Sequence, residues 1–102
     1  MIIKQNMTEK SNKYKIQIQE VELNDGRQSG KSIEFEVENH DDILYLIEQM
    51  QNSSRFENKN ENTEFIVGLK LFSDVMMRNR NNPLFEEFIP AFRQFMKKLK
   101  GK

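Results

Sequence analysis

Residues 14–21, Tyr-Lys-Ile-Gln-Ile-Gln-Glu-Val, decide the fold because large and polar side chains alternate along them. A period of two in a run rich in β-branched and aromatic residues is typical of a half-buried β-strand. Residues 33–38, Ile-Glu-Phe-Glu-Val-Glu, repeat the alternation, and Asn24-Asp25-Gly26 and Ser29-Gly30 between the runs are turn sequences. The pattern predicts an antiparallel β-hairpin in which Ile33, Phe35 and Val37 of the second strand point inward.

After residue 40 the apolar residues recur every three or four positions, which is the spacing of an amphipathic helix. The first helix is predicted over residues 41–51, with Asn39 or Asp41 as its capping residue. Residues 52–63 are polar and rich in Asn, which indicates a connecting loop. Phe56 is the expected anchor of that loop to the core.

The second helix is predicted to begin at a cap formed by Asn62 or Thr63 and to end near Arg78 or Asn79. Gly68 lies inside this helical pattern. Glycine costs about 1 kcal/mol relative to alanine in a helix interior. We therefore expect another backbone to approach closely at this position.

A third helical region follows, with Asn82 as cap and Pro83 at the first helical position, where a missing N–H costs nothing. Pro90 interrupts the region and removes a backbone hydrogen bond. We expect a short helix to about Phe88, a kink, and a second helix over residues 90–99.

The order of elements predicts an α+β fold: a two-stranded antiparallel hairpin followed by three to four helices packed on one face. A single domain is expected over residues 13–100, preceded by a polar N-terminal arm over residues 1–12. That arm could also contribute a third short strand.

The composition of the 102 residues excludes several classes of protein. The chain has no cysteine, which excludes disulfide scaffolds, thiolate metal sites and cysteine nucleophiles. No run approaches the roughly 18 apolar residues that cross a bilayer, and the first six residues lack the apolar stretch of a signal peptide. A cytoplasmic protein that needs no cofactor or metal and is not an enzyme is the expectation.

The net charge of zero conceals an uneven distribution of charge. Residues 1–15 carry a net charge of +3, residues 16–64 carry −8, and residues 65–102 carry +5. Such asymmetry can mark a nucleic-acid or membrane partner. Complementarity within the fold, or between two copies, accounts for it more simply.

Four segments carry a resemblance to a known family: Glu-Asn-His-Asp-Asp at 38–42, Gly-Leu-Lys-Leu-Phe-Ser at 68–73, Asn-Arg-Asn-Asn-Pro-Leu-Phe at 79–85, and the run from Pro90 to Lys100. Over residues 14–100 the layout resembles the small bacterial domain-of-unknown-function family DUF3861. The resemblance implies a compact domain with no assigned activity, so no catalytic residue follows from it.

Two polar constellations have a structural explanation that we favour over a chemical one. His40 beside Asp41 and Asp42 suggests a metal or acid–base site, but no second histidine exists to complete one. Exposed capping residues at a helix start explain this group better. The alternating glutamates 34, 36 and 38 are the expected solvated face of a sheet.

Basic residues near the C-terminus support an alternative function, nucleic-acid association. Arg78 and Arg80 lie in an Arg/Asn-rich turn, and Arg and Asn are common readers of base edges. Against this alternative, the chain lacks the basic excess typical of duplex binders. The residues concerned are Arg78, Arg80, Arg93 and the C-terminal lysines Lys97, Lys98, Lys100 and Lys102.

The helical segments carry more apolar surface than one core contact needs, chiefly as Phe and Met. Surplus apolar surface on a small protein usually marks an interface, and Phe and Met are enriched at interface centres. We therefore predict a small non-catalytic interaction module, homodimeric or bound to a protein partner. The candidate interface residues are Phe72, Met76, Phe88, Phe92, Phe95 and Met96.

Overall fold

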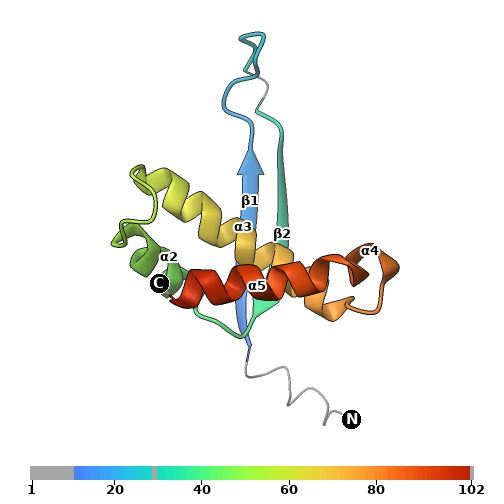
Figure 1. The fold of residues 1–102 in the computed structure, drawn as a ribbon. Helices are drawn as coiled ribbons and strands as arrows, with labels where there is room; N and C mark the ends of the chain where they lie inside the picture. Colours follow the sequence, from blue (N-terminus) through green and yellow to red (C-terminus); the bar gives the residue numbers. More distant parts are fainter. Residues whose placement is uncertain (1–10, 29, 102) are drawn as a thin grey trace. The chain divides into compact units, whose positions relative to one another are not determined.

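The computed structural model describes residues 11–28 and 30–101, and Figure 1 shows their elements in chain order. These described residues form two strands and four helices, which confirms the predicted α+β class: β1 (Asn12–Gln19), β2 (Ser32–Asn39), α2 (Ile43–Gln51), α3 (Lys59–Arg78), α4 (Pro83–Glu86) and α5 (Phe88–Gly101). The third short strand considered for the N-terminal arm falls on residues outside this description. The single domain over residues 13–100 stays a prediction. The chain divides into two compact units, which we call the hairpin unit (Met1–Leu46) and the helical unit (Ile47–Lys102).

In the hairpin unit, β1 pairs with β2 as the predicted antiparallel hairpin. Ile18 lies opposite Ile33, Ile16 opposite Phe35, and Tyr14 opposite Val37, so the large side chains share one face. On the other face, Lys15 Nζ lies 4.0 Å from Glu34 Oε1, an exposed diagonal ion pair. The amide of Glu20 donates to the carbonyl of Lys31 (2.8 Å) and extends the ladder by one residue pair.

The apolar face of the hairpin is more exposed than the alternation suggests. Ile18 is 60% exposed and Ile33 59%, and Phe35 is also exposed. The expectation that Ile33 and Phe35 point into a core is therefore wrong, whereas Val37 is half-buried. Alternation specifies which side chains share a face, but it does not specify whether another element covers that face.

At the tip of the hairpin, Gly26 adopts a φ of +89°, as the Asn-Asp-Gly turn predicts. Its amide donates to the carbonyl of Leu23 (2.8 Å). The side chain of Asp25 accepts two hydrogen bonds from Arg27, one from the backbone N–H (3.1 Å) and one from Nε (2.8 Å). These bonds lower the pKa of the Asp25 carboxyl below its ordinary value, the backbone bond contributing most.

At the base of the hairpin, Tyr14 links β1 to the start of α2. Its hydroxyl donates to the carbonyl of Asp41 (3.1 Å) and accepts from the amide of Ile43 (3.0 Å). The side chain of Asp42 accepts from the amide of Tyr45 (3.1 Å), so Asp42 caps the helix and α2 begins at Ile43. The predicted capping residues, Asn39 or Asp41, were therefore wrong. The side chain of the buried Asn39 instead accepts a hydrogen bond from the amide of Asp41.

In the helical unit, α3 begins at Lys59, ahead of the predicted start. Asn58 is its cap, with a side chain that accepts from the amides of Asn60 and Glu61. The first turn of α3 contains no apolar residue, so the apolar spacing in the sequence did not indicate it. Asn62 is therefore inside the helix and buried, where its Nδ2 donates to the carbonyl of Phe56 (3.1 Å). The expected close approach at Gly68 is also wrong, since only its own stretch of α3 lies within 4 Å of the point that an alanine Cβ would occupy.

Asn82 and Pro83 start α4 as predicted, with the Asn82 side chain accepting from the amide of Leu84 (2.9 Å). The break that follows comes earlier than expected, at Glu87, and α5 already begins at Phe88. Pro90 therefore lies in the first turn of α5. Backbone N–H groups there have no partner within the helix, so proline is tolerated without a kink.

Candidate interaction surface

Seven of the eight phenylalanines lie in the helical unit and form one continuous chain of ring contacts. Phe65 and Phe72 lie two turns apart on α3, and their partners Phe95 and Phe88 lie in reverse order on α5, as in an antiparallel helix pair. Centroid separations run from 5.3 to 6.3 Å, within the range of favourable aromatic pairs. The order of contact along the chain is Phe56, Phe65, Phe95, Phe92, Phe88, Phe72 and Phe85.

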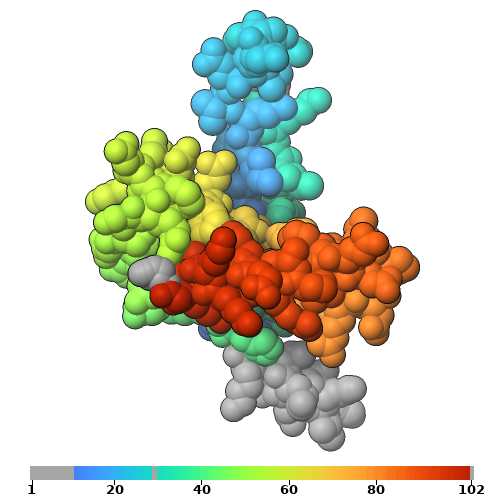
Figure 2. Space-filling model, in the orientation of Figure 1, coloured from blue at the N-terminus to red at the C-terminus, as the bar shows by residue number. Residues whose placement is uncertain are grey.

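Part of this ring chain reaches the surface. Phe72 is 44% exposed, Phe88 43% and Phe95 41%, and Phe92 between them is half-buried. We call these four residues the Phe face. In Figure 2 the side chains of α5, in red, form part of the visible surface of the helical unit. Ring contacts join all four residues, so the exposed apolar atoms form one patch rather than scattered positions.

The two methionines among the predicted interface residues differ in position. Met76 is fully buried, at 0% exposure, and forms part of the core. The Met76 side chain therefore takes no part in any interface that the protein forms in this conformation. Met96 is half-buried and lines a groove on α5. The neighbour of Met76 in the sequence, Met77, is 43% exposed and lines the same groove.

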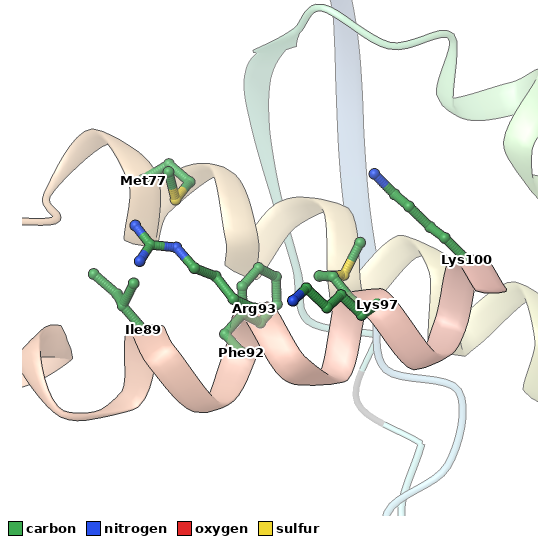
Figure 3. A pocket seen from close by; sticks show the side chains of 7 residues that line it. Met77, Ile89, Phe92, Arg93, Lys97 and Lys100 are labelled. Carbon is green, nitrogen blue, oxygen red and sulfur yellow. The ribbon is translucent and has the colours of Figure 1, made fainter.

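The groove has a volume of about 350 Å³ and lies between the end of α3 and the length of α5 (Figure 3). We call it the basic groove. Its apolar lining consists of Met77, Ile89, Phe92 and Met96, and its cationic lining consists of Arg93, Lys97 and Lys100. None of the described residues that line it is acidic.

Sequence reasoning named the three cations but did not group them with Met77 and Ile89. The available signal was their spacing: positions 93, 97 and 100 follow the three/four period of one helix face. The remaining cations of the nucleic-acid alternative do not line this groove. Arg78, Arg80 and Lys98 are exposed elsewhere on the helical unit, and Lys102 lies outside the described residues.

The two polar constellations that the sequence singled out in the hairpin unit are exposed. His40 is exposed in the bend before α2. No group of three or more described His, Cys, Asp or Glu side chains is placed to hold a metal ion. None of the described helices combines the length and apolar character needed to cross a membrane.

Comparison with known proteins supports the fold and supplies no activity. No curated protein matches the chain. The crystal structure of a protein of unknown function from Pectobacterium atrosepticum is similar, with 36% sequence identity and a TM-score of 0.78. The alignment covers 90% of this chain and 99% of that one. A family model described as a domain of unknown function with a solved structure, DUF3861, matches residues 12–101, so the chain belongs to the DUF3861 family.

Proposed function

We propose that the protein is a small non-catalytic interaction module that self-associates through the Phe face. The observation that carries the proposal is the exposure of Phe72, Phe88 and Phe95, each above two-fifths, within one connected patch. Removing apolar surface from water contributes about 25 cal/mol per Å² of gross free energy. Part of this gain offsets the translational, rotational and side-chain freedom lost on association. Aromatic side chains also dominate the centres of protein interfaces.

The construction of the patch supports its use as an interface. Phe92 and the inner edges of the exposed rings already pack against one another, so little side-chain freedom remains to be lost on association. A pre-ordered aromatic surface of this kind is a better anchor than isolated flexible side chains. Two copies that meet through the same patch form a closed two-fold dimer, the commonest symmetric assembly.

The experiment is size-exclusion chromatography with light scattering across a series of protein concentrations. We expect the mass to rise from 12.2 kDa towards twice that value as concentration increases. The variant Phe72→Gln keeps a helix-forming residue in α3 and should weaken association by about tenfold or more, as for a hot-spot residue. The control Ile18→Gln removes an apolar residue of the hairpin that is more exposed than Phe72, and it should leave association unchanged. A wild-type mass that stays at 12.2 kDa throughout contradicts the proposal.

Nucleic-acid association through Arg78, Arg80, Arg93 and the C-terminal lysines stays the alternative. The same proteins can be titrated with labelled single-stranded and duplex oligonucleotides at two salt concentrations. Binding that falls steeply with salt and is unaffected by Phe72→Gln would favour this alternative.

A further inference from the structure

The basic groove differs from the Phe face in position and in chemistry. Ile89, Arg93, Met96 and Lys100 follow one another at three/four spacing and so form a row along one side of α5. Phe88 and Phe95 each precede a member of that row by one residue, about 100° away around the helix. Phe92 belongs to both surfaces. Apart from this shared residue, the two surfaces can be changed separately.

The charges of the groove favour an anionic occupant. Arg93, Lys97 and Lys100 lie along about 10 Å of helix, and Figure 3 shows Arg93 and Lys97 between Ile89 and Lys100 on the same side of α5. Like charges this close repel one another, and no described lining residue is acidic to offset them. An occupant with carboxylates at matching spacing would relieve that repulsion.

The apolar lining favours an occupant that is also partly apolar. Met77, Ile89 and Met96 offer a surface of flexible and branched side chains, and methionine adapts its shape to varied apolar partners. A nucleic-acid backbone would satisfy the cations but leave this surface without a partner. A purely apolar segment would cover the apolar lining but leave the cations without a partner.

The length of the groove matches one class of peptide structure. From Ile89 to Lys100 the lining extends about 16 Å along α5, the length of a helix of three turns. A helix that lies in a groove presents anchors at i, i+3, i+4 and i+7, the same spacing as the groove cations. We propose that the basic groove binds an acidic amphipathic helix of a partner protein. Its apolar side chains lie on Met77, Ile89 and Met96, and its carboxylates face the three cations. The inference rests on the proposed role as an interaction module, but it uses the side of α5 adjacent to the Phe face.

The test uses the full chain and a fluorescein-labelled synthetic peptide. The peptide is an amphipathic helix with leucines at i, i+3, i+4 and i+7 and glutamates beside them, and its matched control has lysine at every glutamate position. We expect the acidic peptide to bind, the lysine peptide to bind about tenfold more weakly or not at all, and added salt to weaken the acidic complex. No binding of the acidic peptide, or equal binding of both peptides, would overturn the proposal.

Two neighbouring lysines provide matched variants. Lys97→Glu reverses a charge in the groove, and Lys98→Glu makes the same change at an exposed position of α5 that does not line it. We expect the first variant to weaken binding of the acidic peptide by about tenfold and the second to change it by less than about twofold. Equal effects of the two variants would show a non-specific charge effect and overturn the assignment to the groove.

Self-association separates this proposal from the proposed function. Lys97→Glu should leave the dimer mass unchanged, and Phe72→Gln should leave peptide binding unchanged. If the peptide fails to bind a protein that still dimerises, only the groove proposal is lost. If a labelled oligonucleotide binds in place of the acidic peptide and Lys97→Glu abolishes that binding, the occupant is a nucleic acid and the helix proposal is wrong.

Discussion

The hairpin unit and the helical unit differ in how they pack their apolar side chains. In the hairpin, Ile18 and Ile33 lie opposite each other across two strands, and both are about three-fifths exposed. In the helical unit, Phe65 and Phe72 pack edge to face with rings from α5, and Met76 is fully buried. A two-stranded sheet has no second layer to cover its apolar face, whereas two antiparallel helices interdigitate their side chains. Backbone pairing therefore dominates the hairpin, and side-chain packing dominates the helices.

Adjacent methionines in α3 should show the largest contrast. Met76→Ala leaves a cavity at a fully buried position, so we expect it to lower the free energy of unfolding by about 2–5 kcal/mol. Met77→Ala removes a side chain that is 43% exposed and should cost less than about 1 kcal/mol. Urea unfolding followed by far-ultraviolet circular dichroism measures both. Equal losses would mean that packing in the helical unit does not centre on Met76.

The same substitution at two glycines should have opposite signs in the two units. Gly26 in the hairpin turn has a φ of +89°, which strains an alanine, so Gly26→Ala should destabilise by about 1–2 kcal/mol. Gly68 lies in the interior of α3 with open space around it, so Gly68→Ala should stabilise by about 0.5–1 kcal/mol. Thermal unfolding of both variants checks the signs. A destabilising Gly68→Ala would restore the close backbone approach that the sequence suggested.

The exposed cross-strand pair of the hairpin should contribute little. Ile18→Thr and Ile33→Thr keep β-branched side chains, and we expect each to cost less than about 1 kcal/mol. A double-mutant cycle should give a coupling of about 0.2–1 kcal/mol, the range for directly opposed pairs. Losses as large as that of Met76→Ala would show that this face is covered in solution.

The smallest expected effect is a pH dependence at the hairpin tip. The Arg27 backbone N–H, and then its guanidinium, lower the pKa of Asp25 in the folded chain. Stability from this group is therefore fully present above the ordinary aspartate pKa and is lost as pH falls through the folded value. A carboxyl titration by NMR should show the depressed pKa of Asp25. Arg27→Ala keeps the backbone N–H and removes the guanidinium, so it should return that pKa only part of the way towards the ordinary value. An unchanged pKa of Asp25 in that variant would contradict the contribution given to the Arg27 guanidinium.

Local signals in the sequence were sufficient for the antiparallel hairpin, the Asn82 cap and the Pro83 start. Each depends on neighbours in the chain or on a period of two. The beginning of α3 escaped prediction because Asn58 caps a first turn with no apolar residue, so only hydrogen bonding identifies it. Residue type could not show that Met76 is buried and Met77 exposed, because burial depends on where the partner helix lies. The groove was equally hidden, because it combines Met77 of α3 with a row of α5.

A concentration series of amide NMR spectra tests most directly whether the helical unit, rather than the hairpin, is the surface of self-association. We expect the amides of α3 and α5 around Phe72, Phe88 and Phe95 to shift progressively as concentration rises, while those of β1 and β2 stay fixed. Shifts confined to β1 and β2 would instead place association at the exposed hairpin face. Spectra that do not change with concentration, together with a mass of 12.2 kDa, would contradict self-association altogether.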